Sequence, residues 1–151
     1  IAGLEYRIKS KESYLRKVVA NYKPSGTQYE VKDILRYTFT SDSDNLTEKT
    51  LLSIDKFKEK GYNTVEIKNY WLNKNNPYNG INTFVKSSSG QKFELQYHTP
   101  ESFAVKNGEM HKLYEKWRLL PNNSEEKVNI EKQMKRLSES MEAPKDIERV
   151  K

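Results

Sequence analysis

The stretch with the strongest chemical pattern is Glu94-Leu95-Gln96-Tyr97-His98-Thr99. Alternation of apolar and polar residues predicts a β-strand, because successive side chains of a strand point to opposite faces. Glu94, Gln96 and His98 then share one face. A carboxylate on such a face can bind a cation or accept a proton from an attacking hydroxyl. The same pattern also fits an amphipathic surface strand whose polar side is solvated.

A second group of polar residues has the spacing Arg7-x-Lys9-x-x-x-Ser13-x-x-x-Lys17. In an extended segment Arg7 and Lys9 point the same way, and in a helix Ser13 and Lys17 lie one turn apart on one face. Cationic and hydroxyl groups near a helix N-terminus, where backbone amides are free, suit a polyphosphate. A solvated basic helix face would have the same spacing.

Asp33 and Glu94 could form a metal site if they lie on neighbouring strands. Two carboxylates can hold one Mg²⁺ that also bridges substrate phosphates. Alternatively, Asp33 ends a turn and Glu94 pairs with a lysine. Neither His98 nor His111 has a second histidine or a cysteine at ligand spacing, so the pattern does not favour a metal site built on histidine.

Aromatic residues flank a loop that is rich in asparagine. Tyr70 and Trp71 precede this loop, and Pro77-Tyr78-Asn79-Gly80 closes it. Aromatic rings beside a phosphate site can stack on a nucleobase. The alternative is that Tyr70 and Trp71 anchor the loop in the core.

The elements that must position these residues follow from hydrophobic periodicity and turn signals. A buried stripe is expected on the first helix at Tyr14, Leu15, Val18, Val19 and Tyr22, and Lys23-Pro24-Ser25-Gly26 then breaks the chain. The predicted elements are an extended segment over 4–9, helices over 10–21, about 46–60, 101–107, 109–119 and 124–141, and strands over 34–40, 62–71, 81–87 and 91–98. This order predicts an α+β fold with a mixed, roughly five-stranded sheet flanked by helices.

Composition sets limits on the partners of the chain. The 151 residues predict a single domain over 1–151, with a core over about 4–120 and a packing helix over about 124–141. A net charge of +6 suits a polyanion such as a nucleotide or RNA. There is no cysteine, so disulfides and thiolate metal sites are excluded. No apolar run approaches the length of a membrane span.

Taken in order, these motifs resemble the synthetase domain of the RelA/SpoT-like family, which has a nucleotidyltransferase-type fold. The ATP loop of that family reads Arg-x-Lys-x-x-x-Ser-x-x-x-Lys and is matched at Arg7, Lys9, Ser13 and Lys17. Its magnesium aspartate opens a strand, as Asp33-Ile34-Leu35 does here. Its acceptor loop contains Asn-Gly, as at Asn79-Gly80. Its catalytic strand Glu-x-Gln-x-Arg-Thr is matched at Glu94, Gln96 and Thr99, with His98 in place of the arginine.

The resemblance implies an ATP-dependent pyrophosphokinase, which transfers pyrophosphate from ATP to the 3′-hydroxyl of an acceptor. Glu94 and Gln96 would be catalytic, and Asp33 and Glu94 would hold Mg²⁺. The four residues of the ATP loop would bind ATP. The acceptor would lie beside Tyr70, Tyr78, Asn79, Gly80 and His98.

Two departures from the family pattern bear on the acceptor. The tyrosine that stacks on guanine in the family is Ile81 here, and the loop histidine is Val85. An adenine nucleotide, giving products of the (p)ppApp type, is therefore the first expectation for the acceptor. The 3′ end of tRNA is the second, because its binding would also suit the basic charge.

The chain also resembles divergent family members that form C-terminal toxin domains of larger bacterial proteins. A start at Ile1 rather than Met fits such a fragment. This implies a toxin that acts in the bacterial cytoplasm, delivered as part of a secreted effector and guarded by an immunity protein. The remaining alternatives are an inactive nucleotide- or RNA-binding module, an ADP-ribosyltransferase-type toxin, and a scaffold domain.

Overall fold

The computed structural model describes residues 1–21 and 34–151, except for the side chain of Tyr6. These residues form one four-stranded mixed sheet in the order β1-β4-β3-β2. Only β1 and β4 are parallel, and the other neighbours are antiparallel. The strands are β1 (Arg36–Thr40), β2 (Tyr62–Asn69), β3 (Ile81–Ser87) and β4 (Lys92–His98). The predicted α+β architecture with a mixed sheet is confirmed.

The sheet has four strands in the described residues, not about five. The segment over 4–9, which was expected to be extended, contains the short 3₁₀ helix η1 (Leu4–Tyr6). On either side of η1 the chain makes single bridges to the sheet edge, Ala2 with Thr38 and Ile8 with Leu35. A turn of 3₁₀ helix interrupts the alternation that a continuous edge strand would need.

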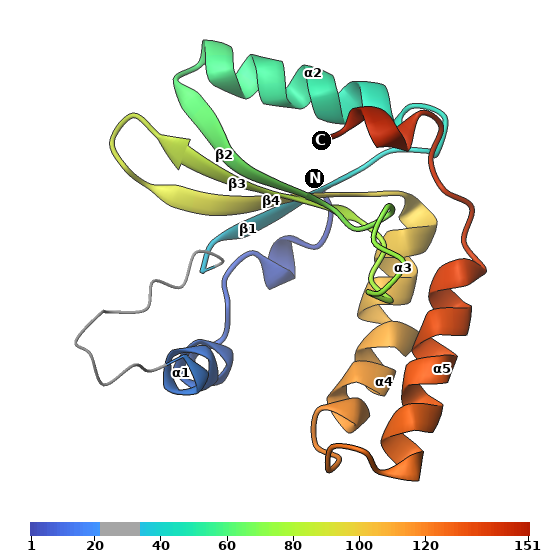
Figure 1. Ribbon diagram of the computed structural model, residues 1–151. Coiled ribbons are helices and arrows are strands. Elements are labelled where there is room, and N and C mark those ends of the chain that lie inside the picture. Colours follow the sequence, from blue (N-terminus) through green and yellow to red (C-terminus); the bar gives the residue numbers. More distant parts are fainter. Residues whose placement is uncertain (22–33) are drawn as a thin grey trace.

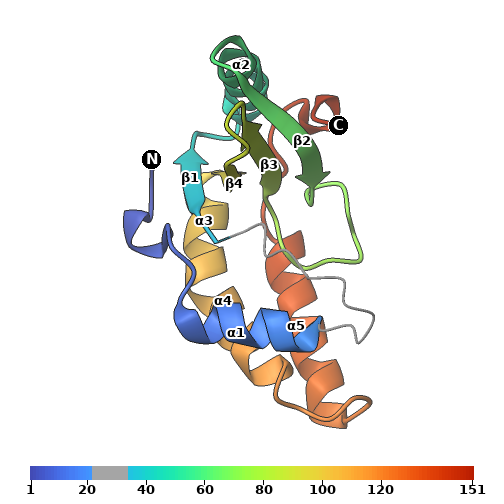
Figure 2. The ribbon, with the colours of Figure 1, turned by 90° about the vertical axis from the view of Figure 1, so that its left-hand side faces the viewer.

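Helices lie on both sides of the sheet. One face carries α2 (Leu46–Glu59) and the 3₁₀ helix η2 near the C-terminus (Ile147–Arg149), and the opposite side carries the other helices (Figures 1 and 2). The latter are α1 (Lys11–Ala20), α3 (Pro100–Asn107), α4 (Glu109–Trp117) and α5 (Glu125–Glu139). Within the described residues, no helix is both long and apolar enough to span a membrane.

The two faces of β4 have different roles. Phe93, Leu95 and Tyr97 belong to the main core, together with Leu46 of α2 and Ile147 of η2. Glu94, Gln96 and His98 point to the opposite side of the sheet, as the alternation predicts. They are not solvated, because their exposed fractions are 3%, 3% and 0%. The sequence pattern left a solvated surface strand open, and the structure excludes it.

Local signals define several helix ends. The Ser10 hydroxyl accepts a hydrogen bond from the Ser13 amide at 3.2 Å and caps α1. Thr99 and Ser102 form a reciprocal capping box at the start of α3, where Pro100 occupies the first turn. These positions begin the helices where the sequence predicts.

The expected buried stripe on the first helix is wrong for the described residues. No residue in Lys11–Ala20 is buried, and Leu15 and Val19 are 49% and 74% exposed. The helix projects from the edge of the sheet and does not pack on it (Figure 1). Tyr22, the last residue of the stripe, and the predicted break at 23–26 lie outside the described residues.

The last helix packs on a helix and not on the sheet. Ile130 and Met134 of α5 form a second small core with Met110 of α4. Beyond α5 the chain returns to the main core, where Ile147 and Val150 are buried. The Asn69 side chain holds this segment by donating to the carbonyls of Ile147 and Val150 at 2.8 and 3.0 Å.

Candidate active site

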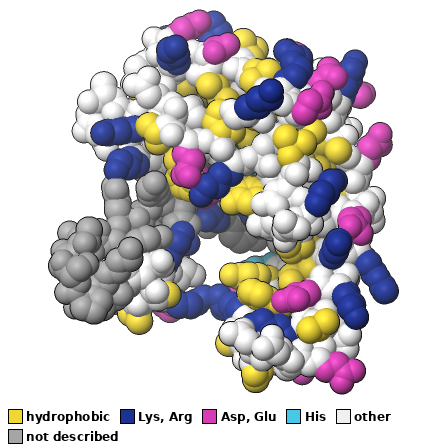
Figure 3. Space-filling model, viewed as in Figure 1, with side chains coloured by type: hydrophobic (Ala, Val, Ile, Leu, Met, Phe, Trp, Pro, Cys, Tyr) yellow, Lys and Arg dark blue, Asp and Glu magenta, His cyan; other side chains and the backbone are white. Residues whose placement is uncertain are grey.

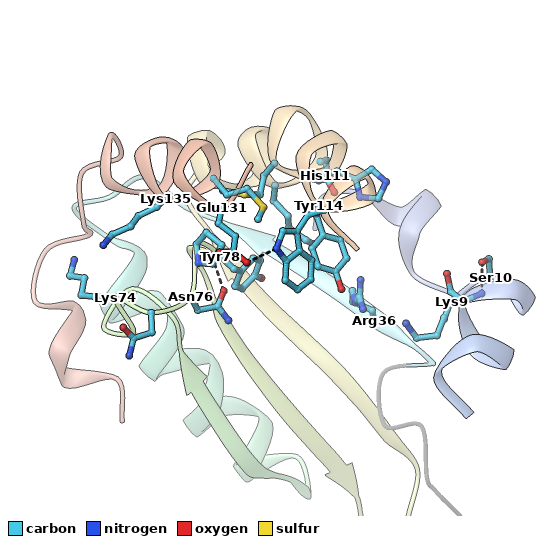
Figure 4. A pocket seen from close by; sticks show the side chains of 18 of the residues that line it. Lys9, Ser10, Arg36, Lys74, Asn76, Tyr78, His111, Tyr114, Glu131 and Lys135 are labelled. Carbon is cyan, nitrogen blue, oxygen red and sulfur yellow. Dashed lines mark hydrogen bonds between the residues drawn. The ribbon is translucent and has the colours of Figure 1, made fainter. Parts of the chain in front are cut away.

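A cavity of about 1160 Å³ lies on the polar side of the sheet. Its walls come from the α1 region, β1, the asparagine-rich loop and helices α3 to α5. Lys and Arg side chains border this hollow (Figure 3). The cations that line it are Lys9, Arg36, Lys74, Lys106 and Lys135, and the carboxylates are Glu5 and Glu131. Figure 4 shows Lys9 and Arg36 on one side and Lys74 and Lys135 on the other. Such an excess of positive charge suits a polyphosphate.

Glu94 lies behind the wall of this cavity and is held at both carboxylate oxygens. Arg36 Nε donates to Oε2 at 2.7 Å, and Asn82 Nδ2 donates to Oε1 at 2.8 Å. Arg36 and Glu94 are partners in the parallel register of β1 and β4, and Asn82 lies across on β3. Three neighbouring strands therefore fix one buried carboxylate.

Gln96 is fixed by a lysine that sequence reasoning did not select. Lys106 Nζ, from α3, donates to Gln96 Oε1 at 2.5 Å. Burial, and after it the charge of Arg36, lowers the pKa of Lys106 to about 8, while Glu94 acts in the opposite direction. Lys106 also lines the cavity and so connects Gln96 to the solvent side of the site.

His98 is completely buried and makes hydrogen bonds at both ring nitrogens. Its Nε2 lies 2.8 Å from the Tyr78 hydroxyl, and its Nδ1 lies 2.9 Å from the Ser102 hydroxyl. Burial lowers the pKa of His98 to about 3, assisted by the charges of Lys106 and Arg36. The ring is therefore neutral, and it does not line the cavity.

The Asn79-Gly80 pair has a packing role in this structure. The Asn79 side chain bonds to Ser138 of α5. A Cβ at Gly80 would lie 2.6 Å from His98 Cε1 and 2.8 Å from the Tyr78 oxygen, so no larger residue fits without displacement. Asn79 therefore anchors the loop to α5, and Gly80 allows the backbone of the loop to lie against the His98 ring.

The structure brings some of the predicted site residues to the cavity and leaves others away from it. Lys9, Ser13 and Tyr78 line the cavity. Arg7 is exposed and Lys17 is half-buried, and neither lines the cavity. The ring of Tyr70 packs edge-on against Tyr78, with ring centroids 5.0 Å apart.

Asp33 lies outside the described residues. Within residues 1–21 and 34–151, no group of three or more His, Asp or Glu side chains is placed to hold a metal ion. Of the predicted metal pair, the structure places Glu94 alone.

Three residues that contact the polar face of β4 or its partners were missed by sequence reasoning. Arg36, Lys106 and Asn82 have no motif of their own, and each is recognised only through its contact with β4. The register of β1 against β4 could have indicated Arg36, because it pairs Arg36 with Glu94. No comparable sequence signal identifies Lys106.

Aromatic residues reach the cavity from α4. Tyr114 is 47% exposed, and its ring stacks on Trp117 with centroids 5.7 Å apart and planes 24° apart. Trp117 is fixed by a 2.8 Å bond from its Nε1 to Glu131 Oε1 and by Lys127, whose Nζ lies 4.4 Å from the ring centroid. Both rings line the cavity. Trp71, by contrast, is in the main core, which agrees with the alternative that it anchors the loop there.

Comparison with known proteins gives matches at the level of structure. No protein-family model matches the chain, and no curated protein matches it significantly in sequence. Small alarmone synthetase 1 from Bacillus subtilis, bound to its product pppGpp, is similar with a TM-score of 0.64 and 20% identity over 89% of this chain and 68% of that chain. A GTP pyrophosphokinase family protein from Streptococcus pneumoniae matches with a TM-score of 0.63 and 15% identity over 88% and 66% of the two chains.

A third similar structure comes from an effector. The complex between the Type VI effector Tas1 and its immunity protein contains a chain that matches with a TM-score of 0.56 and 22% identity, over 87% of this chain and 77% of that one. At these identities the matches establish the fold. The chain has the fold of the small alarmone synthetases and GTP pyrophosphokinases, so the predicted resemblance to RelA/SpoT-like synthetases is confirmed at the level of the fold.

Proposed function

We propose that this protein transfers pyrophosphate from ATP to the 3′-hydroxyl of an adenine nucleotide. The observation that carries the proposal is Glu94, a buried carboxylate fixed by Arg36 and Asn82 directly behind a cavity lined with cations. The alarmone synthetase fold supports pyrophosphate transfer as the type of reaction.

Lys9 and Ser13 are the residues of the predicted ATP loop that we assign to the donor phosphates, because both line the cavity. Arg36 and Lys106 add positive charge at the back of the same cavity. Bound phosphates would compete with Glu94 for the Arg36 guanidinium. Movement of Arg36 onto the phosphates would uncover Glu94 Oε2 at the moment when the substrates are in place.

In the transfer step, a bond forms between the acceptor 3′-oxygen and the β-phosphorus of ATP. The bond from that phosphorus to the oxygen that bridges it to the α-phosphate breaks, and AMP leaves. Glu94 accepts the proton of the attacking hydroxyl, and the cations of the cavity stabilise the charge on the phosphate oxygens. The catalytic effect comes from positioning and electrostatics, as is typical of phosphoryl transfer.

Mg²⁺ is the proposed cofactor, with Asp33 and Glu94 as its ligands. Each carboxylate oxygen has two lone pairs, and Arg36 and Asn82 each use one of those on Glu94, so Glu94 can still contribute to a metal site. When bound, Mg²⁺ would neutralise charge on the donor phosphates.

Burial of two positions supports an acceptor other than a guanine nucleotide bound in the family manner. Ile81 and Val85, which replace the guanine-stacking tyrosine and the loop histidine, are 0% and 1% exposed. Neither can contact a base. Tyr78 lines the cavity but is held by Asn82 and His98, and the other aromatic surface is that of Tyr114 and Trp117 on α4, which we assign to the base of the acceptor.

We further propose that the protein acts as a toxin in the bacterial cytoplasm, is delivered as the C-terminal domain of a secreted effector and is guarded by an immunity protein. The structural similarity to a chain of the Tas1–immunity complex supports this biological setting.

The test is to incubate the protein with γ-labelled ATP and Mg²⁺ and, separately, with adenine nucleotides, guanine nucleotides and tRNA. We expect AMP to appear together with label on the adenine nucleotide. Label on tRNA or on a guanine nucleotide would overturn the assignment of the acceptor. Untouched ATP in every reaction of a folded protein would overturn the transferase and would make NAD the next substrate to test.

The matched variants for this assay are Glu94→Gln and Glu66→Gln. Glu94→Gln keeps the shape of the side chain and removes its charge, and we expect transfer to fall at least 100-fold, within the range usual for loss of a general base. Glu66 lies on β2 and is paired with Lys68 away from the cavity, so its variant should retain activity. Full activity of Glu94→Gln would contradict the assignment of the catalytic carboxylate.

A further inference from the structure

A continuous line of hydrogen bonds runs behind the cavity from α3 to the catalytic carboxylate. Ser102 contacts His98, His98 contacts Tyr78, Tyr78 contacts Asn82, and Asn82 contacts Glu94. The four distances are 2.9, 2.8, 2.8 and 2.8 Å in that order. Ser102, His98 and Glu94 are at most 3% exposed, and Tyr78 and Asn82 between them are half-buried.

The chemistry of the groups determines the direction of every bond in this line. The Glu94 carboxylate accepts a hydrogen bond from Arg36. A carboxylate can only accept hydrogen bonds, so Asn82 must be the donor in its bond to Glu94, and the NH₂ group of the Asn82 amide faces Glu94. The carbonyl oxygen of Asn82 therefore faces Tyr78, and the single hydroxyl proton of Tyr78 is donated to it. The Tyr78 oxygen must then accept from His98, which places the proton of the ring on Nε2.

The other end of the line agrees with this direction. With its proton on Nε2, the imidazole has a free lone pair on Nδ1. The Ser102 hydroxyl can donate to this nitrogen at 2.9 Å in preference to the Thr99 carbonyl, its other acceptor, at 3.3 Å. The Ser102 oxygen is fixed by the capping box of α3, in which it accepts from the Thr99 amide at 3.1 Å. The N-terminus of α3 thus holds the ring in the tautomer that the carboxylate at the far end requires.

We propose that His98 is a positioning residue that, as the Nε2–H tautomer, orients the Glu94 carboxylate through Tyr78 and Asn82. The inference rests on the proposed function, in which Glu94 is the catalytic residue. Arg36 fixes only Oε2, and rotation of the carboxylate about its terminal torsion would remain free without a contact at Oε1. Asn82 supplies that contact, and the orientation of its amide is determined by Tyr78 and His98.

Two features of the chain support this role for the histidine. The low pKa of His98 keeps the ring neutral, so that Nδ1 remains an acceptor. Gly80 provides the space for the ring and for the Tyr78 hydroxyl, since a Cβ there would come within 2.6 Å of His98 Cε1.

Three substitutions at position 98 test the proposal. The amide of His98→Gln can still donate to Tyr78, whereas His98→Asn is too short to reach it and His98→Leu has no donor. We expect His98→Gln to retain at least half of the wild-type kcat. We expect kcat to fall at least 10-fold in His98→Asn and His98→Leu, with the KM for ATP unchanged, because Glu94 is displaced while the donor site is intact.

A direct spectroscopic readout does not depend on turnover. In ¹⁵N-histidine NMR spectra, His98 should show a protonated Nε2 and an unprotonated Nδ1, and this pattern should change in Tyr78→Phe, which removes the hydroxyl and keeps the ring. His111, which is exposed on α4, gives the other histidine signals, and His111→Gln assigns them. Thermal unfolding of each variant establishes that it is folded.

The outcomes separate this inference from the proposed function. An inactive wild-type protein would contradict the proposed function, and the NMR tautomer would still test the hydrogen-bond line. An active wild type together with a fully active, folded His98→Leu would overturn the positioning role, as would a proton on Nδ1 of His98. Inactivity of a folded His98→Gln would also overturn it, because the imidazole itself would then be required.

Discussion

Each polar side chain on the buried face of β4 has a partner from another element. Glu94 is paired with Arg36, Gln96 with Lys106, and His98 with Tyr78 and Ser102. A buried polar group without a partner costs about 1–3 kcal/mol, so these pairings are necessary for the strand to be buried at all. The same pairings fix the orientation of each polar side chain. The stability of the strand and the proposed function of the site therefore depend on the same hydrogen bonds.

The buried histidine predicts a dependence of stability on pH. The pKa of His98 is about 3 in the folded protein, against the ordinary value of 6.5 for a free histidine. Between these values the unfolded chain binds a proton that the folded chain does not, so the free energy of unfolding falls as pH decreases. We expect protonation of this histidine in the unfolded chain to lower the free energy of unfolding by about 2 kcal/mol between pH 7 and pH 5.

Urea unfolding of the wild type and of His98→Gln at both pH values measures this contribution. The decrease in the free energy of unfolding between pH 7 and pH 5 should be smaller in His98→Gln by about 2 kcal/mol, because the two proteins share all other titratable groups. His111→Gln is the control for removal of a histidine as such. Equal pH dependence in the wild type and His98→Gln would contradict a neutral, buried His98.

At the scale of the elements, the cavity is formed between parts of the chain that are far apart in sequence. The α1 region and β1 contribute Lys9, Ser13 and Arg36, and α4 contributes Tyr114 and Trp117. The α1 region and α4 lie on one side of the sheet, and β1 is an edge strand of the sheet itself (Figure 2). A basic wall and an aromatic wall in one cavity suit a ligand with both phosphates and a base.

The aromatic wall leads to a prediction about the acceptor. Loss of base stacking costs about 1–3 kcal/mol, so Tyr114→Ala should raise the KM for the acceptor roughly 10-fold or more and leave the KM for ATP unchanged. Tyr114→Phe keeps the ring and is the matched control, with a KM near that of the wild type. Steady-state kinetics with each substrate varied in turn measures both values. An unchanged acceptor KM in Tyr114→Ala would place the base elsewhere.

At the scale of the whole molecule, the C-terminal residues close the core. Ile147 and Val150 are 5% and 0% exposed and pack with residues of α2 and the sheet. Two residues at the start of α2 hold the C-terminal segment. The Thr47 hydroxyl donates to the Lys145 carbonyl at 2.6 Å, and Glu48 pairs with Arg149. The last residues therefore belong to the same cooperative unit as the sheet that carries Glu94.

Truncation of this contact should destabilise the protein without altering the site. Ile147→Ala removes buried methyl groups and leaves a cavity, which costs about 2–5 kcal/mol in the free energy of unfolding. Leu119→Ala is the control, because Leu119 is 80% exposed and its variant should differ from the wild type by less than about 0.5 kcal/mol. Denaturant unfolding monitored by circular dichroism compares the two. Equal stability of the two variants would show that the C-terminal residues are not part of the core.

The elements that depend on local physics could be predicted from the sequence alone. The alternation in Glu94–Thr99 predicted β4 and assigned Glu94, Gln96 and His98 to one face, because the period of a strand is a property of its backbone. The predicted helix starts at 10 and 124 agree with caps at Ser10 and Ser124, because a cap needs only a side chain and the amide three residues away. The order of the motifs indicated the synthetase fold.

Which side chains meet depends on the folded arrangement of distant segments. Arg36 and Lys106 carry no local signal, and they become part of the site because strand pairing and the packing of α3 bring them to Glu94 and Gln96. The apolar pattern of α1 predicted burial, but burial requires an opposing surface, and in the described residues the sheet does not extend to this helix. Contact between distant residues depends on the path of the whole chain, and the periodicity within one segment carries no information about that path.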